Sequence, residues 1–148
     1  MVRITIIALL LAMSACQREE PSAPAEPVSI PRSPAPVTAA VYFVTPADRD
    51  TVSSPIRIEF GLKNMEVVPA GTAAPNSGHH HLLIDTDLPD FGQPIPADER
   101  HIHFGDGSTS TELTLEPGEH TLQLLLADHL HIPHNPPVVS ERITIMVE

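Results

Sequence analysis

The chain of 148 residues has little positive charge, few aromatic side chains and a single cysteine. Eight Lys and Arg oppose nineteen Asp and Glu, which gives a formal net charge of -11. Because a nucleic-acid-binding protein needs a basic surface for the phosphates, this composition excludes nucleic acid as a partner. One cysteine forms no internal disulfide, four-cysteine zinc site or iron-sulfur cluster. The chemistry of the chain must therefore come from other side chains.

The first sixteen residues explain the single cysteine. Arg3 precedes an apolar run over residues 4–13, and small residues stand directly before Cys16. This is the layout of a secretory signal peptide, and the run is too short to span a bilayer. Its end resembles a bacterial lipobox, which implies that residues 1–16 are a lipoprotein signal peptide and that Cys16 is the lipid attachment site. The alternative is an ordinary signal, with Cys16 lost on cleavage or left free.

Residues 17–37 are predicted to form a disordered tether rich in Pro and Ala. They carry six of the seventeen prolines and show no hydrophobic period, so they bury too little apolar surface to fold. In lipoproteins, a residue other than Asp after the lipidated cysteine, here Gln17, implies retention at the outer membrane. We expect a lipid-anchored protein on the periplasmic side of the bacterial cell envelope, which contacts the membrane only through the lipid.

Residues 38–148 predict one all-β domain. Residues 56–62 alternate apolar and polar side chains, as a half-buried strand does, and residues 143–147 repeat the pattern. Short segments of strand character are separated by Pro, Gly, Asn and Asp, and they are 40–45, 56–62, 65–68, 79–85, 101–104, 111–115, 120–127 and 143–147. This pattern indicates an antiparallel β-sandwich of about seven to eight strands.

The turn before residues 120–127 indicates the type of sandwich. Pro117 and Gly118 precede His120, and this run resembles the corner of immunoglobulin-like domains, where a tyrosine bonds back to the chain. His120 stands in the place of the tyrosine. We therefore predict an immunoglobulin-like sandwich and interpret His120 as a structural residue.

The other eight histidines lie in three short segments, 79–81, 101–103 and 129–134, and each segment contains His-x-His. On a strand, this spacing places two imidazoles on one face, about 6.5 Å apart, so both can reach one metal ion. Three copies favour a metal site built from at least two segments, and a pH-responsive or merely solvated polar face is the alternative. The candidate ligands are His79, His81, His101, His103, His129, His131 and His134.

Strand alternation separates these histidines into two groups. His80 shares a face with Leu82, so we expect it to be buried and rank it as the weakest candidate. His101 and His103 point away from the apolar Ile102, and they form the best single pair. Four carboxylates are available as oxygen ligands or as acceptors that orient the imidazoles, with a solvated turn residue as the alternative for each: Asp85, Asp98, Glu99 and Asp128.

The available ligand atoms narrow the choice of metal. The domain has no free thiol and only two methionines, Met65 and Met146, so a thioether-rich site for monovalent copper is excluded. Imidazole ligands suit copper(II) or zinc, and the affinity order of first-row metals favours copper.

Several motifs of the domain resemble one known family. They include Gly-His-His-His-Leu-Leu-Ile-Asp at 78–85, His-Ile-His-Phe-Gly at 101–105 and Asp-His-Leu-His-Ile-Pro-His at 128–134. Through these motifs, nearly all of the folded part of the chain resembles the bacterial domain-of-unknown-function family 4399. The resemblance implies an exported domain with these histidine motifs as its hallmark, and it supplies no reaction.

Three classes of function remain open. We favour a periplasm-facing lipoprotein that binds copper or zinc for buffering, delivery or sensing. One alternative is a copper- or zinc-dependent enzyme, and another is an envelope interaction module whose histidines respond to pH and bind a protein partner. The sequence has no Gly-x-Ser-x-Gly motif for nucleophilic catalysis. It therefore favours binding over catalysis and leaves enzyme activity open.

Overall fold

The alternating pattern of the sequence forms nine strands in the computed structural model, which describes residues 30–148 and shows no helix there. The strands are β1 (Ala40–Thr45), β2 (Thr51–Val52), β3 (Ile56–Lys63), β4 (Glu66–Val67), β5 (Ser77–Ile84), β6 (His101–His103), β7 (Ser110–Leu113), β8 (Gly118–Ala127) and β9 (Ile143–Val147). All eight expected strands are present. The ninth, β2, was missed because two residues are too few to show an alternation. Within the described part of the chain, no helix has the length and apolar character to cross a membrane.

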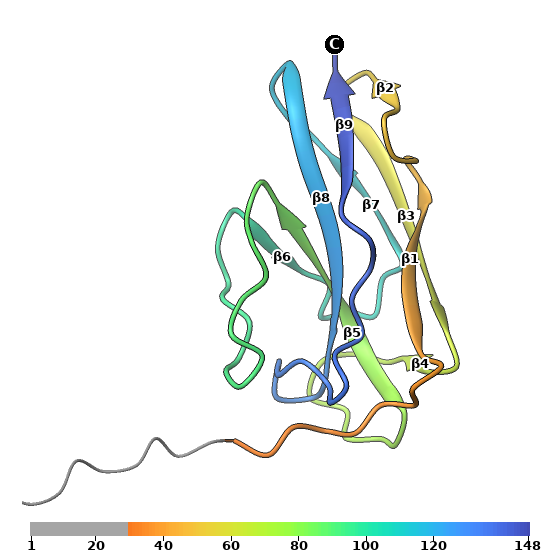
Figure 1. Cartoon of the computed structure of the whole chain (residues 1–148), viewed down its shortest axis with the longest axis vertical. Coiled ribbons are helices and arrows are strands. Elements are labelled where there is room, and N and C mark those ends of the chain that lie inside the picture. The colour runs from red at the N-terminus through yellow and green to blue at the C-terminus, as the bar shows by residue number, and fades with distance from the viewer. Residues whose placement is uncertain (1–29) are drawn as a thin grey trace, which may run out of the picture.

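Two sheets pack against each other. The smaller has the order β1-β3-β7, and the larger has the order β2-β9-β8-β5-β4, with β6 paired to β5 (Figure 1). The long pairs are antiparallel, whereas the two short pairs β2–β9 and β4–β5 are parallel. The predicted all-β sandwich is confirmed, and the structure adds these two parallel pairs at the ends of the larger sheet.

The core between the sheets follows the predicted alternation. Leu122, Leu124 and Leu126 of β8 are fully buried and face Ile58 of β3, which is also fully buried. Burying one such side chain contributes about 1.5–3 kcal/mol of transfer free energy. This core fixes which face of β5 points inward and which points outward.

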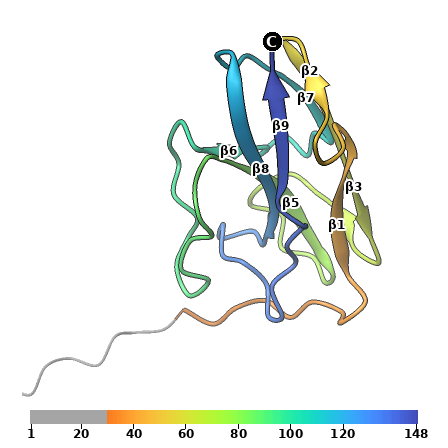
Figure 2. The ribbon, with the colours of Figure 1, turned by 45° about the horizontal axis from the view of Figure 1, so that its top comes forward.

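The outward face of the larger sheet is also covered. Leu83 and Leu125 lie on this face and form a second buried cluster with Ile95, against which Val139 packs. Ile95 belongs to the loop between β5 and β6, and Val139 to the loop between β8 and β9. We call these two segments, residues 85–100 and 128–142, the covering loops, and Figure 2 shows both reaching the end of the sandwich away from the C-terminus. Because of them, β5 is buried along its whole length.

The first described residues pack on the domain, although the sequence predicts them as part of the tether. The Asn135 N–H donates to the Ser33 carbonyl at 2.9 Å, and the Ala35 N–H donates to the Asn135 carbonyl at 3.2 Å. The Arg32 guanidinium donates to the carbonyl of Pro133 at 2.9 Å. The folded part therefore starts before residue 38, because a short extended segment can pair with a loop even where its composition predicts disorder.

Some predictions fall on residues that the structure does not describe. The signal peptide over residues 1–16, the lipid attachment site Cys16 and the first part of the tether all lie outside the described residues 30–148.

The His120 side chain, near the start of β8, bonds back to the turn that precedes the strand, as predicted. Its Nε2 lies 2.9 Å from the Glu116 carbonyl oxygen, and its Nδ1 lies 2.7 Å from Oδ2 of Asp85. Both ring nitrogens face oxygen acceptors, so only the imidazolium, with two N–H groups, satisfies both. The hydrogen bond to Asp85 raises the pKa of His120. Partial burial acts to raise the pKa of Asp85, but hydrogen bonds from the Thr121 N–H and from His120 lower it.

This pair predicts a pH-dependent stability. Because the pKa of His120 is raised above 6.5, its contribution is complete below pH 6.5 and is lost as the pH rises through the raised value. The Asp85 contribution is present above pH 3.8 and is lost as the pH falls. We expect His120→Phe to lower the free energy of unfolding by about 1–2 kcal/mol at pH 5.5, and by less at pH 8.5. Urea denaturation at both pH values measures this, and an equal loss at both would contradict it.

His80 points into the sandwich core, as the alternation predicts. It is fully buried, and its ring centre lies 4.7 Å from that of Phe60. Neither of its ring nitrogens has a hydrogen-bond partner among the described residues, and burial lowers its pKa to about 4. His80 is therefore a neutral polar group whose desolvation no hydrogen bond offsets.

Replacing His80 with an apolar side chain should stabilise the fold. We expect His80→Leu to raise the free energy of unfolding by about 1–3 kcal/mol, because leucine has no polar atom to desolvate. Leu82→Ala, at the next inward position of β5, is the control and should lower it by about 2–5 kcal/mol. Denaturant titration of both variants tests this, and a destabilised His80→Leu would show that the imidazole has a favourable role in the core.

Candidate metal centre

Four histidine rings meet beneath the covering loops, on the outward face of the larger sheet. His79 and His81 are two residues apart on β5 and therefore point to the same side. His103 joins them because β6 pairs with β5 so that His81 and His103 are opposite each other. His131 comes from the covering loop after β8. Three segments that are distant in the sequence thus contribute to one cluster.

The nitrogens of the three strand histidines have a spacing that suits one ion. One ring nitrogen each of His79, His81 and His103 lies within 4.8 Å of the other two. The Nε2 atoms of His79 and His81 are 3.2 Å apart. Two nitrogens bound at about 2.05 Å to one tetrahedral ion stand about 3.3 Å apart. This pair therefore already has the spacing of a shared metal, and His103 offers a third nitrogen within 4.8 Å of both.

His131 is the fourth ring of the cluster. Its ring centre lies 5.0 Å from that of His79, 4.7 Å from that of His103 and 6.0 Å from that of His81. The other three pairs of rings have centres 4.9 to 5.0 Å apart. Imidazoles that share one tetrahedral ion have ring centres about 5 Å apart. Five of the six pairs match this value, and the pair of His81 and His131 is wider.

The electrostatics of the cluster keep its buried rings neutral. Burial first, and then the neighbouring His103 and His131, lower the pKa of His79 to about 4. Burial and the neighbouring rings lower the pKa of His81 to about 2. A neutral imidazole is the form that binds a metal, because its second nitrogen then has a free lone pair.

Asp128 organises the loop that carries His131. Its Oδ1 accepts the N–H groups of Leu130 at 2.9 Å and Ile132 at 3.1 Å, and its Oδ2 accepts the Ser33 hydroxyl at 2.6 Å. Burial acts to raise the pKa of this carboxyl, but these hydrogen bonds lower it. The carboxylate thus stabilises the loop that carries His131, but it bonds to no imidazole and is buried, so it has none of the roles expected for it, as a ligand, as an acceptor for an imidazole or as a solvated turn residue.

Three of the seven candidate ligands lie outside the cluster. The Nδ1 of His101 lies 2.8 Å from Oδ1 of Asp98. His134 is buried with its Nε2 3.1 Å from the Ser77 carbonyl oxygen. His129 lines a different cavity, of about 370 Å³. Of the predicted pair of His101 and His103, only His103 belongs to the group whose nitrogens lie within 4.8 Å of one another.

One side of the cluster opens into a cavity of about 250 Å³. His81, His103 and His131 line it together with residues 94–97 of the covering loop. His79 is not part of this lining. The cluster is therefore reachable from solvent on one side.

Comparison with known proteins assigns the family. The family model described as a domain of unknown function, DUF4399, matches residues 58–148 and so includes all four rings of the cluster. The chain belongs to the DUF4399 family. No curated protein and no solved structure matches the chain.

In this DUF4399 domain, Gly105 provides the space for the His103 ring. A Cβ atom added at Gly105 would lie 2.8 Å from Nε2 of His103 and closer still to its Cε1. Ordinary contacts between carbon atoms stand at about 3.5–4.0 Å, so a larger residue must displace the ring. The φ of Gly105 is not positive, so the requirement is for space and not for a special backbone conformation. The sequence reasoning missed this residue, because only the folded ring shows what lies above it.

We expect Gly105→Ala to move the His103 ring out of the cluster with little effect on stability, within about 0.5 kcal/mol. The measurement is the nuclear Overhauser effect between the ring protons of His103 and His131, which the variant should lose. Gly92→Ala is the matched control, because its added Cβ meets only Oδ1 of Asp90, at 3.3 Å. Retention of the His103 contact in Gly105→Ala would contradict this role.

Proposed function

We propose that this domain binds one divalent transition-metal ion, copper or zinc, through His79, His81, His103 and His131. The observation that carries the proposal is the convergence of His79, His81 and His103 at a nitrogen spacing that suits one ion, with the His131 ring beside them. Imidazole nitrogens suit both metals, and the affinity order favours copper where both are present.

The role that we propose for this site is buffering, delivery or sensing of the metal at the bacterial cell envelope. The signal-like start, the lipobox-like Cys16 and the Pro-rich residues that follow support a lipid-anchored protein on the periplasmic side of the outer membrane. The cavity beside the cluster supports binding over catalysis, because its lining outside the cluster, residues 94–97, carries no acid-base side chain.

Two other functions are less well supported. An envelope module that switches with pH needs histidines that titrate near neutral pH, but the pKa values of His79 and His81 are lowered to about 4 and about 2. A copper- or zinc-dependent enzyme is the second candidate, because the cluster opens to solvent on one side and a catalytic metal keeps an open position.

Two neighbouring histidines of β6 test the metal site. We expect the protein to bind one equivalent of copper(II), and zinc more weakly, and we expect His103→Ala to weaken the affinity by about two orders of magnitude. His101→Ala is the matched control, because Asp98 already holds this ring, and it should change the affinity by less than about threefold. Competition titration against a chelator of known affinity measures all three proteins.

The same titration can contradict the proposal in two ways. Equal losses in the two variants would remove His103 from the ligand set. Failure of the unaltered protein to bind either metal near stoichiometrically at pH 7.5 would overturn the metal site itself.

A further inference from the structure

The four rings do not surround their common centre evenly. The ring centres of His81 and His131 are 6.0 Å apart, whereas the other five pairs lie between 4.7 and 5.0 Å. The two triangles of ring centres that contain this pair, one completed by His79 and the other by His103, are the widest faces of the cluster. A further ligand would approach an ion most easily across the edge between His81 and His131.

The cavity of about 250 Å³ includes this edge. Its histidine lining is His81, His103 and His131, so it lies on the His103 side of the edge, and His79 takes no part in it. The rest of the lining is Pro94, Ile95, Pro96 and Ala97, whose side chains are all apolar. A molecule in this cavity would thus contact both metal-binding nitrogens and a hydrocarbon surface.

The charge of the cluster favours an anion in the cavity. Four neutral imidazoles carry no charge to balance a divalent ion, and the carboxylates of Asp106 and Asp128 act on the rings of the cluster only through space. The carboxylate of Asp128 already accepts hydrogen bonds from its own loop and from Ser33, and that of Asp98 accepts one from His101. A negatively charged ligand from outside the chain would supply the missing charge.

We infer that the cavity binds a small aliphatic carboxylate, with one oxygen on the metal and its hydrocarbon chain against residues 94–97. This inference rests on the proposed metal site. The oxygen donates a lone pair to the ion as a further ligand, and no proton or electron is transferred. A water molecule occupies about 30 Å³ in the liquid. The cavity, at about 250 Å³, therefore has the volume of several water molecules and can hold a carboxylate of a few carbon atoms.

The test uses the protein loaded with one equivalent of copper(II), with its metal content measured first. Azide is the probe, because its binding to copper(II) produces a charge-transfer absorption band in the near ultraviolet. Formate, acetate, propionate and butyrate then compete with azide for the site. We expect a saturable azide band, and a carboxylate affinity that rises about twofold to fourfold with each added methylene group.

A substitution in the apolar wall tests the position of the ligand. Ala97→Phe places a ring in the cavity and should weaken propionate binding at least tenfold, again with the copper content verified. Ala73→Phe is the matched control, because Ala73 is also an exposed alanine but lines the other cavity, and it should leave propionate binding unchanged.

The outcomes separate the two proposals. A protein that retains neither copper(II) nor zinc overturns the proposed function, and one that retains only zinc overturns the inference drawn for the copper-loaded site. A copper-loaded protein that shows no azide band, that loses its metal to the anion, or that binds all four carboxylates equally overturns only the carboxylate site. Equal propionate affinities of Ala97→Phe and Ala73→Phe also overturn it.

Discussion

The candidate site depends on the burial of β5 on both of its faces. The inward face packs into the sandwich core through Leu82, and the outward face lies beneath the covering loops through His79, His81 and Leu83. In an antiparallel sheet, one face usually meets water, and polar side chains belong there. Here the covering loops remove that water, so the imidazoles of β5 are desolvated and stay neutral. The same burial that makes them unfavourable for stability keeps their lone pairs available.

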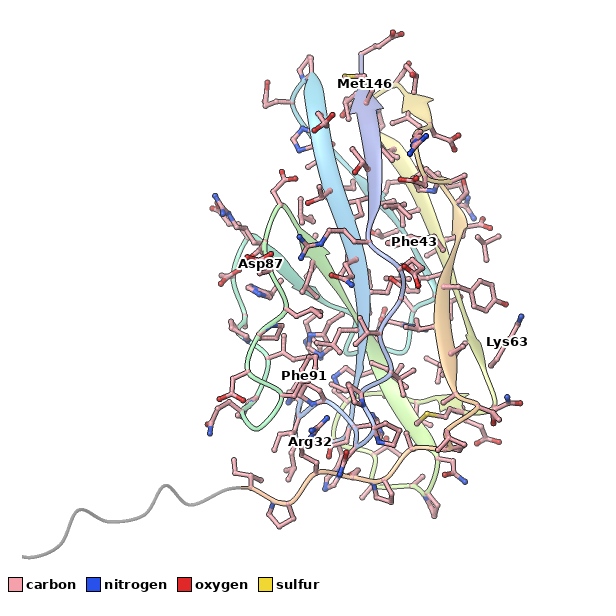
Figure 3. The ribbon with its side chains drawn as sticks, in the orientation of Figure 1. Arg32, Phe43, Lys63, Asp87, Phe91 and Met146 are labelled. Carbon is pink, nitrogen blue, oxygen red and sulfur yellow. The ribbon has the colours of Figure 1, made fainter. Side chains whose placement is uncertain are left out.

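The covering loops hold this arrangement through contacts between segments that are distant in the sequence. The Ile95 N–H of one loop donates to the His131 carbonyl of the other at 2.9 Å. The N-terminal segment contacts both loops: Ser33 donates to Asp128, and the Arg32 guanidinium lies 5.6 Å from the ring centre of Phe91. Figure 3 labels Arg32 and Phe91 near each other at the lower end of the sandwich. The position of the fourth ring is therefore set jointly by three pieces of chain.

The sequence predicted the strands and the faces of their side chains, but it did not predict the conformations of the covering loops. Alternation of apolar residues predicts strands and faces well, because the sandwich core imposes a period of two, and it correctly placed His80 inward and His103 outward. It does not reveal the contact between His101 and Asp98, or the loop conformation, stabilised by Asp128, that places His131 in the cluster. Nor does it reveal that His129 and His134 lie outside the cluster. Periodicity carries no information on loop conformation, which here arises from individual long-range hydrogen bonds.

The division of the ligands between strands and loop bears on how the site would form. Three of the four rings are placed by the pairing of β5 with β6 in the larger sheet. The fourth depends on Asp128, whose carboxylate is shared between its own loop and Ser33. The cluster thus combines three rings placed by strand pairing with one ring whose loop is coupled to the N-terminal segment. The packing of residues 32–35 and the position of the His131 ring are therefore linked through one carboxylate.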